Sequence, residues 1–401
     1  MKVAYVCEPQ IGGTYTSFRQ IREKLLPMGI DYRCVPPTDG REFRGTPFEN
    51  DEGVDYVEYP SSDPAGMAKC LAGRLAEGGY AAAVLLPGCY PFVSSLPPYL
   101  PRSVRCIARM PHNARGVYRP TALMAEHYNR IVAVGPRLKE DLTGGYGVPE
   151  TKVEVIGNGI DAERFRPGDG ATARNAAYVG RIEDVQKNVF LLPKILKRAL
   201  ARDAGARLAV VGDGPDAEEL RARFAAEGLD GRYEMLGRIS PEKMPEALRG
   251  CGVFALPSRF EGCSNSTLEA MASGCVPILS RLRGVSDNLA EEGKSGFLVA
   301  PGDWRGMGDA WGRLMEDEAL WRGMRHAARE RICGRFTIEA TAEAYGRLFR
   351  AILQEADGRP AARPMEEYEV HPGMGPNWRR WIPDGIKKRL RTVAARMGMS
   401  P

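Results

Sequence analysis

The sequence contains nine cysteines, but no pair of them has the C-x-x-C spacing. An odd number of cysteines without this spacing argues against a secreted disulfide framework and a zinc site, and it fits free thiols in a reducing compartment. No stretch approaches the roughly 18 apolar residues of a transmembrane helix. The N-terminal residues MKVAYVCEPQ lead into a strand-like run and do not resemble a secretory signal. These features predict a cytoplasmic protein.

The excess of basic residues is confined to one end of the chain. The formal net charge is +5, and residues 377–401 alone contain seven Lys or Arg and one Asp, a net charge of +6. The remaining residues therefore sum to −1. A nearly neutral body with a basic end argues against general nucleic-acid binding.

Short apolar runs alternate with helix-length amphipathic segments, such as 189–201 and 318–336. This alternation is typical of parallel, doubly wound sheets. The expected strands form two series: 2–7, 30–35, 81–86, 103–108, 130–135 and 152–157, and then 176–180, 207–212, 232–236, 252–257, 276–280 and 296–300. Between the two series, residues 158–175 are rich in Gly, Pro and charge and are interpreted as a linker.

The pattern therefore predicts an α/β protein with two Rossmann-like, doubly wound domains. We expect an N-terminal domain over 1–163, a C-terminal domain over 164–356 and a basic tail over 357–401. Ligands in this architecture bind at the carboxyl ends of the strands, so two such domains are expected to face a central cleft.

The stretch RFEGCSNSTLEAMASGCVPIL, residues 259–279, places Glu261 before an expected helix and Glu269 inside it. Ser264, Asn265 and Ser266 are candidate N-caps, and Gly274 is the expected stop. A helix N-terminus favours an anion such as a phosphate, and carboxylates accept hydrogen bonds from hydroxyl groups. A nucleotide-sugar has this layout, with hydroxyls on both sides of a diphosphate. The alternative is that Glu269 only completes a capping box with Ser266 and that Glu261 is a solvated loop residue.

The same stretch resembles the E-x7-E motif of the retaining GT-B glycosyltransferases of family 4, with Glu261 and Glu269 as its two glutamates. Further matches occur in order along about residues 1–350: GG at 12–13, IVAVGPRLKEDL at 131–142, YGVPETKVEVIGNGID at 146–161, YVGRIEDVQKN at 178–188 and VVGDGP at 211–216. The ordered set is a far more specific signal than any one motif.

The resemblance implies roles for individual residues. Glu261 is expected to contact the transferred sugar and Glu269 the ribose. The diphosphate is expected to bind Arg181, Lys187 and the small residues at the helix start, and the base to meet the end of a strand. The implied donor-binding residues are Gly12, Gly13, Arg181, Lys187, Arg238, Ile239, Asn265, Ser266, Thr267 and Glu269. The active-site histidine of the family corresponds to His112, although Asn113 follows it where the family often has Asp or Gly.

The implied chemistry needs no metal or other cofactor. No two aspartates lie two positions apart, so the Asp-x-Asp device that holds a metal in many transferases is absent. Arg181, Lys187 and the helix start can supply positive charge to the leaving diphosphate instead. The resemblance implies retention of anomeric configuration, and no residue stands out as a covalent nucleophile. A front-face route, in which the leaving phosphate helps deprotonate the acceptor, is therefore the preferred hypothesis.

Other interpretations stay open. Arg181 and Lys187 could be ordinary surface charges, and His112 an incidental loop residue. Gly212 and Gly214 give G-x-G-x-x-A, which could indicate an NAD-dependent oxidoreductase. A GT-B-fold nucleotide-sugar epimerase and a non-catalytic sugar-binding protein are closer rivals. A P-loop at 293–295 is excluded, because Asn288 occupies the position of its first glycine.

The segment 378–397 carries apolar residues on one face of an expected helix and basic residues on much of the rest. This pattern is typical of an interfacial helix on anionic lipid. It would suit a lipid-linked acceptor, with the protein peripheral on the inner face of the membrane. The alternative is that the tail returns to pack on the N-terminal domain.

Overall fold

Two six-stranded sheets form the framework of the protein, whose computed structural model describes residues 1–10 and 12–374. Each sheet belongs to a separate unit. The first unit consists of Met1–Asn158 and the described residues from Ile338 onward, and the second of Gly159–Thr337. All paired strands in both sheets are parallel. The predicted α/β fold with two Rossmann-like units is therefore confirmed.

The sheet of the first unit has the order β2-β1-β3-β4-β5-β6. Its strands are β1 (Lys2–Val6), β2 (Asp31–Cys34), β3 (Ala82–Leu85), β4 (Arg105–Met110), β5 (Arg130–Ala133) and β6 (Val153–Val155). The order reverses between β1 and β3, which is the topological switch point where ligands of such sheets bind. Every expected strand of the first series is present.

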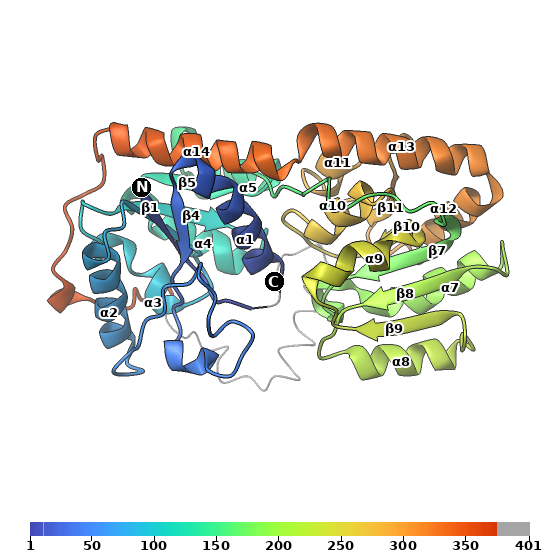
Figure 1. Cartoon of the computed structure of the whole chain (residues 1–401), viewed down its shortest axis with the longest axis horizontal. Coiled ribbons are helices and arrows are strands. Elements are labelled where there is room, and N and C mark those ends of the chain that lie inside the picture. Colours follow the sequence, from blue (N-terminus) through green and yellow to red (C-terminus); the bar gives the residue numbers. More distant parts are fainter. Residues whose placement is uncertain (11, 375–401) are drawn as a thin grey trace. The chain divides into compact units, whose positions relative to one another are not determined.

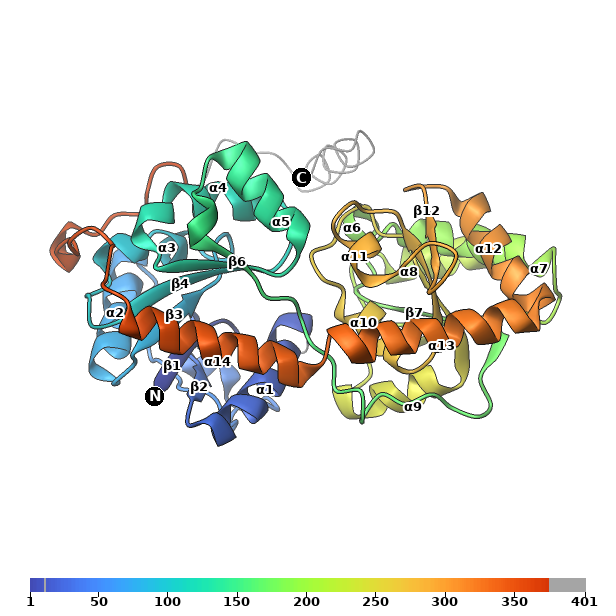
Figure 2. The same ribbon diagram turned by 90° about the horizontal axis from the view of Figure 1, so that it is seen from above.

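The helices of the first unit cover both faces of its sheet (Figures 1 and 2). They are α1 (Gly13–Leu25), α2 (Pro64–Glu77), α3 (Pro91–Ser94), α4 (Arg115–Leu123), α5 (Pro136–Glu140) and α14 (Ile338–Gln354). Buried residues of α1 and α14, among them Phe18, Tyr345 and Phe349, share one hydrophobic cluster with β1 and β2. The α14 helix is thus part of the first unit's core although it follows the whole second unit in sequence.

This placement corrects the expected domain boundary, which put residues up to 356 in the C-terminal domain. Ile338, Tyr345 and Phe349 are each no more than 1% exposed within the first unit's cluster. Their burial there explains why α14 is assigned to that unit. The described part of the expected tail also packs on this unit, since Asp357 pairs with Arg105 at 3.0 Å and Tyr368 donates a hydrogen bond to the Phe92 carbonyl at 2.8 Å.

The sheet of the second unit has the order β12-β11-β10-β7-β8-β9. Its strands are β7 (Thr172–Val179), β8 (Arg207–Val211), β9 (Tyr233–Gly237), β10 (Cys251–Leu256), β11 (Val276–Ser280) and β12 (Phe297–Val299). All six expected strands are present, and β7 already begins inside the stretch 158–175 interpreted as a linker. The switch point lies between β7 and β10.

The second unit also has helices on both faces of its sheet (Figure 2). They are α6 (Asp184–Lys187), α7 (Leu192–Leu200), α8 (Ala217–Ala226), α9 (Met244–Arg249), α10 (Asn265–Ala272), α11 (Ser286–Leu289), α12 (Trp304–Glu316) and α13 (Glu318–Arg335). The α13 helix buries Trp321, Met324, Ala328 and Ile332, whose spacing of three or four residues is that of one helix face.

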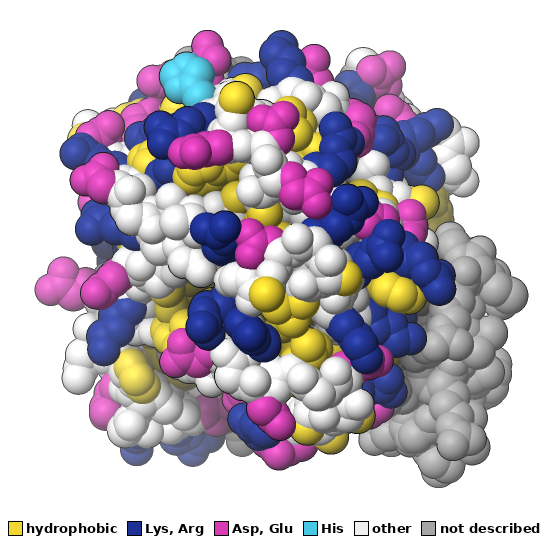
Figure 3. Space-filling view, turned by 90° about the vertical axis from the view of Figure 1, so that its right-hand side faces the viewer, with side chains coloured by type: hydrophobic (Ala, Val, Ile, Leu, Met, Phe, Trp, Pro, Cys, Tyr) yellow, Lys and Arg dark blue, Asp and Glu magenta, His cyan; other side chains and the backbone are white. Residues whose placement is uncertain are grey.

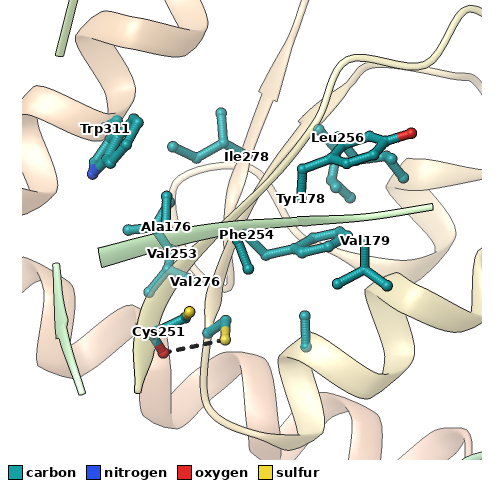
Figure 4. Close-up of a cluster of buried hydrophobic side chains, with 14 of the residues drawn as sticks. Ala176, Tyr178, Val179, Cys251, Val253, Phe254, Leu256, Val276, Ile278 and Trp311 are labelled. Atoms are coloured by element: carbon teal, nitrogen blue, oxygen red, sulfur yellow. Dashed lines mark hydrogen bonds between the residues drawn. The ribbon is translucent and has the colours of Figure 1, made fainter. Parts of the chain in front are cut away.

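The core of this unit is built on its two central strands. Figure 4 shows side chains of β7, β10 and β11 packed together near Trp311 of α12. Every residue of β10, CGVFAL, is buried, as expected for a strand covered on both faces. The Cys275 thiol donates a hydrogen bond to the Cys251 carbonyl at 3.2 Å, so this cysteine is part of the packing.

Several exposed charges on the second unit form ion pairs. Arg198 and Lys197 of α7 lie 2.8 Å from Asp309 and Glu227, respectively. Figure 3 shows basic and acidic side chains interspersed on the face of the molecule in view. Among the helices that the structure describes, none combines the length and the apolar character needed to cross a membrane.

Candidate functional site

Three loops meet at the carboxyl edge of the second unit's sheet, around its switch point. They follow the adjacent strands β10, β7 and β8 and span residues 257–264, 180–188 and 212–216. Tyr178, at the end of β7, donates a hydrogen bond from its hydroxyl to the Arg181 carbonyl at 2.8 Å and so fixes the start of the second loop. Most of the predicted donor-binding residues lie in or beside these loops.

Lys187 and Glu261 form an ion pair across two of the loops. Nζ of Lys187 lies 2.5 Å from Oε1 of Glu261, and the two side chains are 14% and 10% exposed. The Ser258 hydroxyl donates a hydrogen bond to the same carboxylate oxygen at 2.7 Å. The structure therefore joins two residues to which the resemblance gave separate roles, and neither is an ordinary surface charge.

The α10 helix begins directly after Glu261. Ser264 is its N-cap and accepts a hydrogen bond from the Thr267 N–H at 3.3 Å. The interpretation of Ser266 and Glu269 as a capping box is therefore wrong, because the N-cap lies two residues before Ser266. The Thr267 hydroxyl is buried and has no hydrogen-bond partner among the described residues. The helix start thus offers polar groups beside the Lys187–Glu261 pair.

Glu269 lies half-buried on α10. In the described part of the chain, no hydrogen bond or ion pair joins its carboxylate to another residue. Burial raises the pKa of Glu269 to about 7, and the charge of Arg164 opposes this shift only partly. A partly buried carboxylate without a hydrogen bond is costly unless a ligand supplies donors, so this residue fits a binding role better than a capping role.

The other predicted donor-site residues are more exposed. The Arg181 side chain is 64% exposed and lies 3.5 Å from Glu183. Arg238 is exposed and Ile239 half-buried, directly after β9. The structure does not bring Arg181 into contact with the Lys187–Glu261 pair. Because this guanidinium is exposed and its contact with Glu183 is long, it can turn toward an anion.

The glycines of VVGDGP serve close packing. A Cβ on Gly212, whose φ is +136°, would lie 1.9 Å from the Gly180 carbonyl oxygen, and one on Gly214 would lie 2.3 Å from that of Ile182. The two glycines thus allow the chain after β8 to pack against the backbone of the β7 loop. Close packing accounts for both glycines without a bound dinucleotide.

In the first unit, the predicted residues follow two strands of the same sheet. Gly12 and Gly13 lie at the start of α1, after β1. Gly12 has extended backbone, and a Cβ there would meet no atom within 4 Å, so packing does not require a glycine. His112 is half-buried in the loop between β4 and α4, as expected for a residue that follows the fourth strand.

Sequence reasoning missed several residues at these edges. In the second unit these are Ser258, which donates to Glu261, and the ion-paired residues Asp184 and Arg259. In the first unit, Glu8 accepts a hydrogen bond from the Tyr90 hydroxyl at the switch point of the sheet. Burial, with a smaller effect of Glu42, raises the pKa of Glu8. The only signal in the sequence for these four residues, Glu8, Asp184, Ser258 and Arg259, was their position. Each lies just after a predicted strand or at the start of the short helix that follows one.

Comparison with solved structures identifies the class of fold. HepE of Anabaena, solved with UDP and glucose, matches with a TM-score of 0.72 and 16% identity over 88% of this chain and 100% of that one. Sucrose-phosphate synthase of Thermosynechococcus elongatus matches with a TM-score of 0.73 and 19% identity over 88% and 98% of the two chains. The protein has the GT-B fold.

Sequence comparison identifies the family. Residues 11–164 match the family described as glycosyltransferase family 4, and residues 173–317 match glycosyl transferases group 1. The chain belongs to the group 1, family 4 glycosyltransferases.

Individual relatives match over part of their length. D-inositol 3-phosphate glycosyltransferase of Nocardia farcinica is 30% identical over 254 residues, which are 58% of this chain and 55% of that protein. Glycogen synthase of Mycobacterium tuberculosis is 24% identical over 263 residues, 64% of this chain and 62% of that protein. The chain thus spans between about half and two thirds of the length of these relatives.

Proposed function

We propose that the protein is a retaining glycosyltransferase that moves a hexose-type sugar from a nucleotide-diphosphate sugar to a hydroxyl group of a glycan, lipid-linked or small-molecule acceptor. A role in the synthesis of lipopolysaccharide or surface polysaccharide would use such an activity. The proposal rests on the arrangement at the carboxyl edge of the second unit's sheet. The Lys187–Glu261 ion pair lies there beside the start of α10, and α10 also carries Glu269, whose carboxylate forms no ion pair among the described residues.

Each of these groups suits one part of the donor. The α10 start and Lys187 supply positive charge for the diphosphate, whose negative charge grows as it leaves. Arg181, with its exposed guanidinium, can add to that charge. Glu269 can accept hydrogen bonds from the ribose hydroxyls, and Glu261 from the hydroxyls of the sugar. Structures of HepE with UDP and glucose, and of the pneumococcal O-GlcNAc transferase GtfA with UDP and GlcNAc, support a donor of this kind.

The first unit would bind the acceptor. Glu8, Tyr90 and His112 follow three strands at the carboxyl edge of its sheet and present hydrogen-bonding groups suited to a hydroxyl-rich molecule. His112 is proposed as an active-site residue. Gly12, where the fold leaves room for a side chain, would allow close approach of a ligand to the backbone.

Transfer with retention is proposed to proceed on one face of the sugar. The bond from the anomeric carbon to the phosphate oxygen breaks, and a bond to the acceptor oxygen forms on the same face. The acceptor proton passes to the leaving phosphate oxygen. Positive charge from Lys187, Arg181 and α10 takes the place of a metal ion in this proposal, so no cofactor is required.

A donor screen tests the proposal. Thermal shifts with UDP-, GDP- and ADP-sugars should select a donor, and incubation with it should release the nucleotide diphosphate and yield a glycoside with the donor's anomeric configuration. Glu261→Gln should bind the nucleotide and release little product. A nucleotide-sugar epimerase would instead change the sugar on the donor, and a non-catalytic protein would bind in calorimetry without any product. Either of the last two results would overturn the proposed function.

A further inference from the structure

Residues 184–187 and 259–261 also contact each other beside the Lys187–Glu261 ion pair, through hydrogen bonds to backbone atoms. The backbone N–H of Arg259 donates to the Gln186 carbonyl at 2.8 Å, and Nε2 of Gln186 donates to the Phe260 carbonyl at 3.4 Å. Two strand-end loops that are 74 residues apart are thus joined by backbone atoms as well as by their charged side chains.

The Arg259 side chain also contacts the α6 helix directly. Its NH2 lies 3.1 Å from Oδ2 of Asp184, and its NH1 donates to the Asp184 carbonyl and, at 3.4 Å, to the Val185 carbonyl. The Arg259 and Asp184 side chains are only 11% and 9% exposed. The guanidinium therefore binds both the carboxylate and the main chain of the short α6 helix that carries Lys187.

Asp184 is itself fixed from the other side. Its Oδ1 accepts a hydrogen bond from the Phe190 N–H at 3.1 Å, and its own N–H donates to Oδ2 of the buried Asp216 at 2.7 Å. The Arg259 guanidinium thus binds a residue that is fixed by other hydrogen bonds. It thereby restrains the backbone of α6, which carries Lys187.

We propose that Arg259 is a positioning residue for Lys187 and Glu261, acting through Asp184. The inference rests on the proposed function, in which both Lys187 and Glu261 turn toward the donor. A lysine that contacts a diphosphate can no longer hold Glu261 as tightly, so the ion pair alone cannot keep the loops in place during turnover. Arg259 holds them through atoms that the donor does not contact.

The Arg259→Gln variant removes the ionic contact, and the Asp184→Asn/Arg259→Gln double variant does so without leaving one charge buried alone. Both should lower kcat by on the order of tenfold or more, as a displaced catalytic group does. In a Lys187→Gln/Glu261→Gln background the same changes should cost less than about twofold, because both residues that they position are already lost. Equal fold-losses in both backgrounds would overturn the proposal.

A second readout does not depend on activity. Acylation of lysines with an N-hydroxysuccinimide ester, followed by mass spectrometry, reports how well Lys187 is held against Glu261. Arg259→Gln and the double variant should raise the labelling rate of Lys187 several-fold, whereas Lys197, which is 59% exposed and paired elsewhere in the unit, should be unchanged. Arg259→Lys, which keeps the charge, should restore part of the protection.

The outcomes separate the two hypotheses. Raised labelling of Lys187 with no transferase activity in the wild type would support the positioning role and reject the proposed function. Unchanged labelling in a folded variant of an active enzyme would reject the positioning role and leave the function standing. Arg198→Gln, which breaks the exposed pair with Asp309, is the matched control and should change neither rate nor labelling.

Discussion

Oε1 of Glu261 is shared by two donors, Lys187 Nζ at 2.5 Å and Ser258 Oγ at 2.7 Å. One carboxylate oxygen therefore holds a cation from the β7 loop and a hydroxyl from its own loop. We expect the other carboxylate oxygen, Oε2, to face a sugar hydroxyl. Two of the strongest tests of the site follow from the different surroundings of Glu261 and Glu269.

Glu261→Gln should lower turnover strongly while leaving binding of the free nucleotide diphosphate nearly intact, because Glu261 is expected to contact the sugar. Glu269→Ala should weaken binding of the same nucleotide by roughly 1–3 kcal/mol, through the loss of charged hydrogen bonds. Calorimetry and initial rates measure both effects. Loss of nucleotide binding in Glu261→Gln would show that the two roles are wrongly assigned.

The raised pKa of Glu269 predicts a pH dependence of stability. Burial raises this pKa from 4.5 to about 7, so between these values the folded protein keeps a proton that the unfolded chain has lost. Stability therefore falls as the pH rises through this window. Glu269→Gln cannot ionise and should be more stable than the wild type at pH 8, by up to about 3 kcal/mol. The difference should shrink toward pH 5 in urea denaturation.

The same carboxyl group should make binding pH-dependent. If Glu269 must be ionised to accept ribose hydroxyls, nucleotide affinity should rise between pH 6 and pH 8 by up to about tenfold. Glu269→Gln controls for ionisation of the phosphate itself and should show a flatter profile. Identical profiles for the two proteins would remove Glu269 from the donor site.

Activity should survive an excess of EDTA, because Arg181, Lys187 and the α10 start are proposed to stabilise the leaving diphosphate. Initial rates with and without chelator, and after addition of Mg²⁺ or Mn²⁺, measure this directly. Complete loss that either metal restores would contradict the proposal that protein cations replace a metal ion.

Gly212→Ala should destabilise the protein by about 2–4 kcal/mol, because its φ of +136° and the Gly180 carbonyl leave no room for a Cβ. Gly170→Ala is the matched control, since a Cβ there meets nothing within 4 Å, and it should stay within about 0.5 kcal/mol of the wild type. A stable Gly212→Ala variant that had lost nucleotide binding would point to a ligand-binding loop after all.

The proposed membrane contact involves residues 378–397, which lie outside the described residues. Residues up to Met374 pack on the first unit, where Ser95 contacts the Met374 sulfur at 3.3 Å. A truncated protein for this test should therefore retain them. The full chain should co-sediment with anionic vesicles, and a chain ending at Met374 should not. Equal binding of both, or of neither, would remove the tail from any membrane role.

Much of the fold could be predicted from the sequence because parallel strands buried on both faces read as short apolar runs. All twelve strands of the two sheets were expected from such runs. The assignment of α14 could not be predicted, because a helix with one apolar stripe can pack on either sheet. The stripe of Ile338, Tyr345 and Phe349 carries no information about which core it enters.

The candidate site was predictable only in part. The spacing of the two glutamates and the resemblance to family 4 pointed to Glu261, Glu269, Arg181 and Lys187 as separate groups. It could not show that Lys187 pairs with Glu261, because that contact depends on β7 and β10 being neighbours in the sheet. Arg259 was missed for the same reason, since its partner Asp184 is 75 residues away.

The return of α14 to the first sheet has a consequence for synthesis on the ribosome. Domains usually fold in the order in which they emerge. Here the N-terminal sheet emerges first, but Ile338, Tyr345 and Phe349 fill its hydrophobic cluster and the Tyr345 hydroxyl accepts a hydrogen bond from the buried Arg109 at 3.0 Å. The nascent N-terminal half therefore carries an unfilled core and an incompletely paired cation until the entire second unit has been translated. The later half, Gly159–Thr337, is one uninterrupted stretch and can complete its own sheet first.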